Sequence, residues 1–287
     1  MSTTYRLGLT GWPLAHSLSP RLHRAALQAC GLSGEYELYP IPPLPKGLAG
    51  LAALLERLRQ GEITGLNVTI PHKQAVLPLL DMLTFSTQAI GAANTLYRSD
   101  GRLVGENTDA PAFIEYLEQQ FNGSKPGRAL VLGAGGAARA CVYALGCRGW
   151  QVILAARRPE QVEKLVNKFA HLSPAPIAMA QPLPEAAKIM SKADLNLVVN
   201  ATPLGMQPYE QDSPWPEGIS LPSGCLVYDL IYSPPETRLL QQARRQGNPA
   251  IGGLGMLVHQ AALAFLIWTD LPMQDLPAVL RAMHAAI

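Results

Sequence analysis

Three glycines follow a short apolar stretch near the middle of the chain, in the run from Ala129 to Ala138. This pattern predicts a buried strand, a glycine-rich turn and the first turn of a helix. Because Gly133 and Gly135 have no side chains, a pyrophosphate can approach the backbone there, and the helix N-terminus would offer N–H donors. Such a turn can also be a tight turn that binds nothing. The order strand, turn, helix favours a dinucleotide site.

Two adjacent arginines, Arg157 and Arg158, follow the next predicted strand, Gln151 to Ala155. Dinucleotide domains that use NAD place an acidic residue here, which binds the ribose 2′-hydroxyl. In this chain no acid occurs before Glu160, and two guanidinium groups suit a 2′-phosphate. The sequence therefore predicts NADP as the cofactor. The alternative is that the pair is simply exposed to solvent.

Two serines lie at the start of a predicted helix in the first part of the chain. Ser19 would cap this helix, which begins at Ser19-Pro20, runs to Cys30 and stops at Gly31. Two hydroxyls at a helix N-terminus favour an anion, and a substrate carboxylate fits such a site. Capping alone accounts for Ser19 but leaves Ser17 unexplained.

Polar and apolar residues alternate along a predicted strand from Gly65 to Ile70. Asn67 and Thr69 would point to one face and the apolar residues to the other. Buried polar groups need partners, and the hydroxyls of a ligand would serve. Pro71 would end the strand and leave Lys73 at its carboxyl end, where sites in open α/β sheets usually lie. A lone lysine is more often a surface residue. Lys73 is therefore a candidate functional residue only because the polar residues Asn67 and Thr69 precede it on this strand.

A carboxylate and an amide complete the set. Asp109 lies within Asn107 to Pro111, at the start of a predicted helix, and Asn94 directly precedes a predicted hairpin. Thr108 or Asp109 could simply cap that helix. The six histidines show no ligand spacing, so we predict no metal site.

The elements that must position these residues alternate between strand and helix in both halves of the chain. In the first half we expect strands at Tyr5–Thr10, Glu35–Ile41 and Gly65–Ile70, helices at Lys46–Gln60 and Val76–Leu83, and a hairpin of Thr95–Arg98 with Leu103–Gly105. In the second half we expect strands at Ala129–Leu132, Gln151–Ala155, Ile177–Ala178, Leu195–Asn200, Leu226–Leu230 and Pro249–Ile251, then helices at Met256–Thr269 and Pro277–Ala286.

This order predicts an α/β fold: an N-terminal α/β domain that binds the substrate, followed by a doubly wound parallel sheet, the Rossmann fold, that binds the dinucleotide. The expected division is residues 1–108 and 109–253, with 254–287 returning to pack on the first domain. Such an apolar helix as Met256–Thr269 needs a partner face.

Composition excludes several other classes of protein. The 287 residues are 48% hydrophobic and 15% charged, which is enough to bury a core and excludes a disordered chain. A net charge of +2 without a basic stripe argues against nucleic-acid binding. No apolar run reaches the roughly 18 residues of a membrane span. The four cysteines lack metal-site spacing, and no leader precedes the first strand, so we expect a cytoplasmic protein.

Eight segments together resemble the shikimate dehydrogenase family, in order and in spacing. They are HSLSP (16–20), NVTIPHK (67–73), AANTL (92–96), ENTDA (106–110), GAGGAA (133–138), NATPLGM (200–206), YDLIY (228–232) and GLGMLVHQA (253–261). The resemblance implies reduction of 3-dehydroshikimate to shikimate with NADPH, a step of aromatic amino-acid biosynthesis.

The resemblance also implies roles for individual residues. Lys73 and Asp109 correspond to the catalytic pair, and the residues alone do not decide which of them donates the proton. Ser17 and Ser19 would hold the substrate carboxylate. The ring hydroxyls would meet Thr69, Asn94, Asp109, Tyr232 and Gln260. The cofactor would contact Gly133, Ala134, Gly135, Gly136, Ala137, Arg157, Arg158, Leu230 and Gly253.

The chain departs from the family pattern at two places. After the second cofactor strand, members often carry Asn-Arg-Thr and a further Arg, whereas this chain has Ala156, Arg157, Arg158 and Gln161. Ala110 replaces a common glycine. Two alternatives stay open: a quinate/shikimate dehydrogenase that accepts NAD, and a non-catalytic sensor that binds shikimate-like ligands. We expect a monomer or a homodimer.

Overall fold

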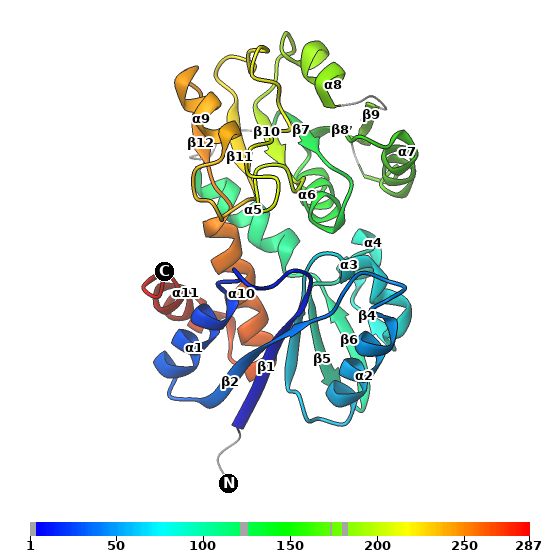
Figure 1. The fold of residues 1–287 in the computed structure, drawn as a ribbon, viewed down its shortest axis with the longest axis vertical. Coiled ribbons are helices and arrows are strands. Elements are labelled where there is room, and N and C mark those ends of the chain that lie inside the picture. Colours follow the sequence, from blue (N-terminus) through cyan, green and yellow to red (C-terminus); the bar gives the residue numbers. More distant parts are fainter. Residues whose placement is uncertain (1–3, 121–125, 173, 180–182) are drawn as a thin grey trace. The chain divides into compact units, whose positions relative to one another are not determined.

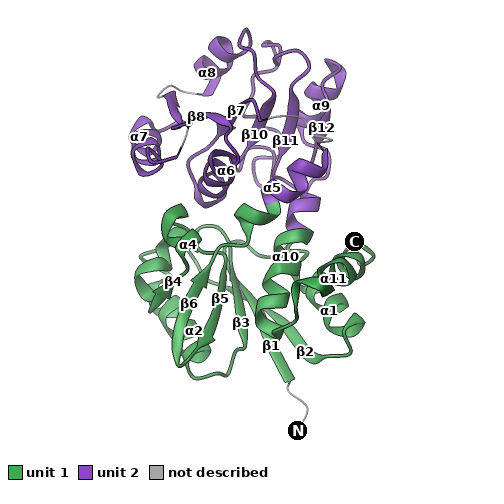
Figure 2. Ribbon diagram, turned by 180° about the vertical axis from the view of Figure 1, so that it is seen from behind, with its two compact units in different colours: residues 1–112, 258–287 green, residues 113–257 purple. Residues whose placement is uncertain are grey.

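The computed structural model describes residues 4–120, 126–172, 174–179 and 183–287 (Figure 1). The chain forms two compact units, residues 1–112 with 258–287 and residues 113–257 (Figure 2). The predicted division into a substrate domain and a cofactor domain stays a prediction. Two helices, α5 (Asp109–Gln120) and α10 (Leu254–Thr269), begin in one unit and end in the other.

The first unit contains a mixed sheet of six strands. Their order is β2 (Ser33–Pro40), β1 (Thr4–Gly11), β3 (Gly65–Val68), β5 (Thr95–Ser99), β6 (Arg102–Glu106) and β4 (Met82–Leu83). Strand β1 runs parallel to both β2 and β3, whereas β5 is antiparallel to β3 and to β6. The predicted hairpin of β5 and β6 is confirmed, and Asp100 and Gly101 at its tip both have positive φ.

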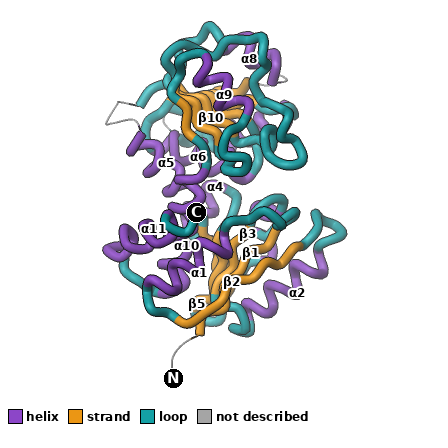
Figure 3. The backbone as a smooth tube through the Cα atoms, turned by 60° about the vertical axis from the view of Figure 1, so that its left-hand side comes forward, coloured by secondary structure: helices purple, strands orange, loops and turns teal. Residues whose placement is uncertain are grey.

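Helices cover both faces of this sheet. Successive residues of a strand point to opposite sides, so strands whose residues are all buried need cover on each side. On one side, α2 (Leu48–Arg59) buries Leu51 and Leu55 against Leu66 of β3. On the other side lies α10 (Figure 3). There Trp268 packs directly on Gly65, where a Cβ atom would come within 2.3 Å of the indole. The remaining helices of this unit are α1 (Ser19–Ala29), α3 (His72–Ala75), α4 (Phe85–Ile90) and α11 (Leu276–His284), and α11 packs against α1.

The second unit contains a wholly parallel sheet of six strands. The order is β12 (Ala250–Ile251), β11 (Leu226–Asp229), β10 (Leu197–Asn200), β7 (Arg128–Leu132), β8 (Gln151–Ala155) and β9 (Ile177–Met179). The helices are α6 (Gly136–Cys147), α7 (Pro159–Lys168), α8 (Leu183–Met190) and α9 (Arg238–Arg245). The chain reverses its direction of winding between β7 and β10, which is where dinucleotides bind in such sheets. The predicted α/β fold is confirmed.

The helix predicted at Val76–Leu83 is wrong. This segment forms a short 3-10 turn at Leu77–Leu79 and then the strand β4 beside β6. Pro78 lacks an N–H group and disfavours a continuous helix. The side chain of Asp81 accepts the backbone N–H of Leu103 at 2.7 Å, which holds the chain beside the sheet.

Among the described residues, no helix combines the length and the apolar character that crossing a membrane requires. Within the same part of the chain, the cysteines form no disulfide.

Candidate active site

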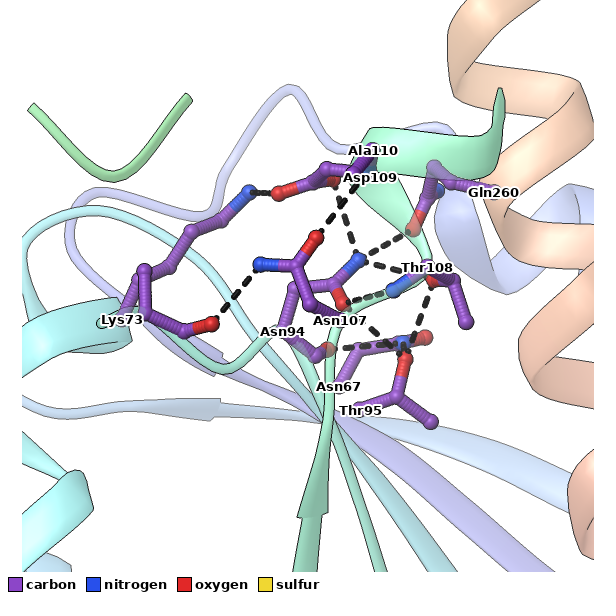
Figure 4. Close-up of polar contacts among 10 residues, drawn as sticks. Asn67, Lys73, Asn94, Thr95, Asn107, Thr108, Asp109, Ala110 and Gln260 are labelled. Carbon is purple, nitrogen blue, oxygen red and sulfur yellow. Dashed lines mark hydrogen bonds and ion pairs between the residues drawn. The ribbon is translucent and has the colours of Figure 1, made fainter. Parts of the chain in front are cut away.

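Lys73 and Asp109 form an ion pair in the first unit, with 2.5 Å between Lys73 Nζ and Asp109 Oδ2 (Figure 4). The Lys73 side chain is 15% exposed and that of Asp109 is 5% exposed. Thirty-six positions separate the two residues in sequence. Most of the Lys73 side chain is therefore packed against protein, and a small part of it is open to solvent.

The sheet brings this pair together. Strand β5 is antiparallel to both β3 and β6, so the end of β3, the start of β5 and the end of β6 lie at one edge. Lys73 follows β3, Asn94 directly precedes β5 and Asp109 follows β6. A backbone hydrogen bond of 2.8 Å from Ala93 N–H to the Lys73 carbonyl fixes the first two segments to each other.

The buried Asn94 side chain joins the pair to its surroundings. Its Nδ2 group donates to Asp109 Oδ1 at 3.0 Å, to Thr108 Oγ1 at 2.9 Å and to Gln260 Oε1 at 3.2 Å. Its Oδ1 atom accepts the Thr108 backbone N–H at 2.7 Å, which fixes the orientation of the amide. Two N–H hydrogens thus serve three acceptors. Both oxygens of Asp109 are thereby held, one by Asn94 and one by Lys73.

Asn67 does not need a ligand as a partner, contrary to the prediction from its strand. Its Oδ1 atom accepts the Tyr36 hydroxyl at 2.8 Å, and its Nδ2 group donates to the Asn94 carbonyl at 3.1 Å. Strand β3 also ends at Val68, so Thr69 lies just beyond it. Asn67 therefore supports the site from below, through the backbone of Asn94. The alternation of polar and apolar residues identified the polar face of strand β3. It could not show that other protein groups supply the hydrogen-bond partners of Asn67.

The prediction that Ser19 caps helix α1 is wrong. The residue before the helix is Leu18, and no side chain caps the first turn. Instead the Ser17 hydroxyl accepts the Ser19 backbone N–H at 3.3 Å. Thr69 is half-buried, and its N–H donates to the Thr10 carbonyl. Within the described residues, no hydrogen bond joins Ser17, Ser19 or Thr69 to the ion pair, although all three follow strands that end at the same edge.

Helix α5 begins at Asp109, and neither Thr108 nor Asp109 caps it. The Asn107 side chain accepts the Ala110 backbone N–H at 3.1 Å and donates to the Ala92 carbonyl at 2.7 Å. Asn107 therefore fixes the start of α5 to the segment that precedes β5. This leaves the Asp109 carboxylate available to Lys73.

In the second unit, the turn between β7 and α6 fits a pyrophosphate. Gly133 has φ +117°, and a Cβ atom there would lie 2.8 Å from the Ala201 carbonyl oxygen. Gly135 is exposed, and a Cβ atom there would meet nothing within 4 Å. Helix α6 starts at Gly136, so its unpaired N–H groups face this open space. Ala134 and Ala137 complete the turn.

Arg157 and Arg158 are both exposed and directly follow β8 and Ala156. The next residue, Pro159, opens α7. Leu230 follows β11, and the Gly253 N–H donates to the carbonyl of Ile231 at 2.9 Å. The fourth predicted substrate residue outside the ion-pair network, Tyr232, lies in this unit, and burial raises the pKa of its phenol.

A buried polar network that no sequence pattern had singled out lies at the same edge of the parallel sheet. Asn200, at the end of β10, donates to Asp229 Oδ1 at 2.9 Å, and Thr237 donates to Asp229 Oδ2 at 2.7 Å. Asn200 and Asp229 occur in segments that carry the family resemblance, whereas Thr237 does not. Their residue types do not reveal that they meet. The described residues contain no group of three or more His, Cys, Asp or Glu side chains arranged to hold a metal ion.

The parallel sheet with its glycine turn, together with a second α/β unit that carries a lysine–aspartate pair, defines a class of two-unit dinucleotide-binding proteins. A family model for the shikimate dehydrogenase substrate binding domain matches residues 9–96, and one for the shikimate 5'-dehydrogenase C-terminal domain matches residues 253–284. A shikimate dehydrogenase (NADP(+)) from Salinibacter ruber is 44% identical over 290 residues, which cover 99% of this chain and 98% of that relative. This chain therefore belongs to the shikimate dehydrogenase family.

Solved structures agree with this membership. Shikimate 5-dehydrogenase from Thermus thermophilus, in complex with NADP(H) and shikimate, has a TM-score of 0.82 and 38% identity, covering 99% of this chain and 100% of that one. Quinate dehydrogenase from Corynebacterium glutamicum, in complex with NAD, has a TM-score of 0.83 and 30% identity, with coverages of 98% and 99%. The fold is thus shared by proteins that differ in cofactor.

Proposed function

We propose that this protein is a shikimate dehydrogenase that reversibly reduces 3-dehydroshikimate to shikimate with NADPH, in aromatic amino-acid biosynthesis. The observation that carries the proposal is the Lys73–Asp109 pair, held at 2.5 Å by buried amides in a chain of this family. A protein that only sensed such ligands would have no need of an ammonium group so placed.

Lys73 has the properties that reduction of a ketone requires. When bound, the reduced nicotinamide supplies a hydride to the carbonyl carbon. Negative charge then grows on the carbonyl oxygen, and the Lys73 ammonium beside it stabilises that charge and can deliver a proton. In the reverse direction the Lys73–Asp109 pair accepts the proton of the hydroxyl group.

Asp109 orients this ammonium group. One carboxylate oxygen binds Lys73, and the other accepts from Asn94, so the carboxylate cannot turn without losing one of the two contacts. A ligand hydroxyl that reaches Asp109 would join a pair already in position, which lowers the entropic cost of catalysis. Lys73 and Asp109 share one contact, so we assign the proton donor to the pair and not to one member.

The other substrate contacts are proposed from the family pattern and the positions described above. Ser17 and Ser19 would bind the substrate carboxylate, next to the first turn of α1. Asn94 and Gln260 already share a hydrogen bond of 3.2 Å, which a ring hydroxyl could replace. Thr69 and Tyr232 would contact the remaining hydroxyls.

The cofactor would bind in the second unit, so residues 113–257 would form the cofactor domain and the first unit the substrate domain. Gly133 to Ala137 would hold the pyrophosphate, and Arg157 and Arg158 would bind the 2′-phosphate. Leu230 and Gly253 would border the nicotinamide. Both arginines are exposed and therefore available to a phosphate.

The experiment that tests the proposal follows NADPH oxidation with 3-dehydroshikimate. We expect turnover in the wild type, and a fall in kcat of about 10²–10³-fold for Lys73→Ala with little change in KM, since the lost contact acts mainly in the transition state. Lys46→Ala, which removes an exposed lysine of the same unit, is the matched control and should keep wild-type activity. A wild type that binds shikimate without oxidising or reducing the cofactor would favour a sensor instead.

The second candidate is a quinate/shikimate dehydrogenase that accepts NAD, which the likeness to the NAD complex of quinate dehydrogenase favours. The two are separated by measuring kcat/KM with NADP and NAD, and with shikimate and quinate. We expect a clear preference for NADP that Arg157→Ala and Arg158→Ala weaken. Equal efficiency with NAD would exclude a 2′-phosphate site at these arginines.

We also propose a cytoplasmic location, in keeping with cysteines that form no disulfide within the described residues. A monomer or a homodimer is the assembly that we propose, and ultracentrifugation would decide between them.

A further inference from the structure

Asp229 is a buried carboxylate that the proposed chemistry does not use. It ends strand β11 with 0% exposure. Its Oδ1 atom accepts from Asn200 Nδ2 at 2.9 Å and from the Ile231 backbone N–H at 3.1 Å, and its Oδ2 atom accepts from the Thr237 hydroxyl at 2.7 Å. All three donors are neutral. Among the described residues, no cation forms an ion pair with it.

Two of these donors, Asn200 and Ile231, adjoin segments of the expected cofactor site. The Asn200 side chain also donates to the Leu204 carbonyl at 3.1 Å and accepts from the N–H and hydroxyl of Thr202, so it shapes the loop after β10. That loop includes Ala201, whose carbonyl lies against Gly133 of the glycine turn. Asp229 is thereby linked to the turn proposed for the pyrophosphate.

The second donor leads to the other end of the cofactor. The Ile231 N–H binds Asp229, and the Ile231 carbonyl accepts the Gly253 N–H at 2.9 Å. The Leu230 N–H in turn donates to the Asn200 carbonyl at 3.0 Å. Leu230 and Gly253 are the residues proposed to border the nicotinamide. Leu230 is therefore bonded directly to Asn200, and Gly253 is bonded to Ile231, which Asp229 holds in place. Thr237 adds the N-terminus of α9, whose first turn it caps.

From these contacts we infer that Asp229 is a positioning residue for the cofactor site, which holds the loops after β10 and β11 in the conformation that binds NADP(H). The inference rests on the proposed function. An ionised carboxylate accepts hydrogen bonds at both oxygens, and such bonds are about twice as strong as those between neutral groups. If the carboxyl were protonated, its O–H group would face one of the three N–H or O–H groups whose hydrogen bonds the carboxylate now accepts.

The stability of the fold does not explain this charge. Burial raises the pKa of Asp229 to about 6 from an ordinary value of 3.8, although its three hydrogen bonds act in the other direction. The folded state thus favours the neutral form more than the unfolded state does. At neutral pH the charged carboxylate lowers the free energy of unfolding. This free energy rises again as the pH falls and the carboxyl is protonated. A role in binding therefore explains a charged group at this position better than a role in stability does.

The titratable groups on the neighbouring elements are engaged elsewhere. They are Tyr228, whose ring stacks on Phe113, Glu236, which pairs with Arg244, and Arg238, which donates to Gln211. Tyr232, three residues after Asp229, is itself kept neutral by burial, which raises its pKa. The pH response that we expect at this position accordingly belongs to Asp229.

The test compares Asp229→Asn with wild type by calorimetric titration of NADP+ at pH 7.5 and pH 5. The amide has nearly the same shape, and Thr237 can turn its hydroxyl to accept from it. At pH 7.5 we expect Kd for NADP+ to rise about 5–20-fold, with no loss of thermal stability. At pH 5, where the wild-type carboxyl is protonated, the two Kd values should converge to within about twofold. The 2′-phosphate titrates identically in both proteins and cancels in their ratio.

Asp194→Asn is the matched control, because it makes the same chemical change at an exposed position before β10, at the opposite end of that strand. It should leave Kd unchanged at both pH values. An unchanged Kd in Asp229→Asn at pH 7.5, or a ratio to wild type that stays the same at pH 5, would overturn the inference.

Thr237 provides a second route if Asp229→Asn does not fold. Thr237→Ser keeps the hydroxyl and should bind NADP+ like wild type, whereas Thr237→Val removes it and should weaken binding about 3–10-fold. Equal Kd values in these two variants would overturn the inference. Shikimate oxidation by the wild type is measured separately. A wild type that binds NADP+ but does not oxidise shikimate would refute the proposed function and leave the test of Asp229 intact.

Discussion

At the scale of single residues, His23 shows how burial alone sets the behaviour of a titratable group. Its ring is fully buried on α1, stacked at 4.3 Å on Tyr36 and 5.3 Å from the ring of Trp268. Burial lowers the pKa of His23 to about 3, and a contact with Asn67 opposes this only in part. The folded protein therefore contains neutral His23 at every pH at which it is expected to work.

This predicts a loss of stability in acid. The pKa of His23 in the folded state, about 3, lies below the ordinary value of 6.5. Neutral His23 therefore makes its full contribution to the free energy of unfolding above pH 6.5, and this contribution falls as the pH drops. From pH 6.5 to pH 5 the loss should approach about 2 kcal/mol. His23→Phe keeps the aromatic packing and should remove this part of the slope, as measured by urea unfolding at the two pH values. His284→Phe, at an exposed position, should keep the wild-type slope, and an equal slope in His23→Phe would contradict the prediction.

At the scale of elements, the turn from β7 to α6 combines two demands on one residue. Gly133 has φ +117°, a conformation that side chains rarely adopt, and lies against the Ala201 carbonyl. Any Cβ atom there would push the loop after β10 away from the turn. The shape of the proposed pyrophosphate site and the stability of the sheet therefore depend on the same glycine.

Gly133→Ala should lower the free energy of unfolding by about 2–3 kcal/mol. We expect it also to raise Kd for NADP+ more than about tenfold. Gly149→Ala is a suitable control, because Gly149 also has positive φ but its Cβ would meet nothing within 4 Å. The control should lose about 1 kcal/mol and keep its affinity. Chemical unfolding and NADP+ titration measure both effects, and similar affinities in the two variants would show that the turn does not touch the cofactor.

Most elements could be predicted from the sequence because short apolar runs alternate with polar segments, glycines and prolines. Strands β7 and β12, which end directly before Gly133 and Gly252, show this most clearly. Prediction failed at Val76–Leu83, where the apolar residues reflect packing on the core around Leu66 and not helical periodicity. It also failed for the serine cap of α1, because residue type does not tell which of two neighbouring hydroxyls accepts a hydrogen bond.

The candidate site was predicted only in part. Lys73, Asn94 and Asp109 were named from their residue types and positions, and Gln260 from the family resemblance. The structure shows that the four form one hydrogen-bonded cluster. The support beneath this cluster, Tyr36 and Asn67, and the role of Asp229 were not predicted. Such contacts join distant segments, and a single sequence does not record which buried polar groups meet.

At the scale of the whole molecule, the two units should respond separately to the two ligands. If NADP(H) binds between residues 113 and 257, it should slow hydrogen exchange around the glycine turn and the segments after β10 and β11. Shikimate should slow exchange near residues 15–20 and 67–73. Mass spectrometry of peptic fragments measures this. NADP+ protection confined to residues 1–112 would contradict the proposed division of roles.

The last helices also bear on how the chain is made. Trp268 of α10 packs on Gly65, and its indole N–H donates to the Leu96 carbonyl at 3.0 Å. The sheet that is synthesised first thus lacks part of the cover on one face until residues 258–287 have left the ribosome. The middle unit has no such requirement, since its residues are contiguous. We therefore expect the middle of the chain to mature before its beginning, and the nascent N-terminal sheet to be the species that needs a chaperone.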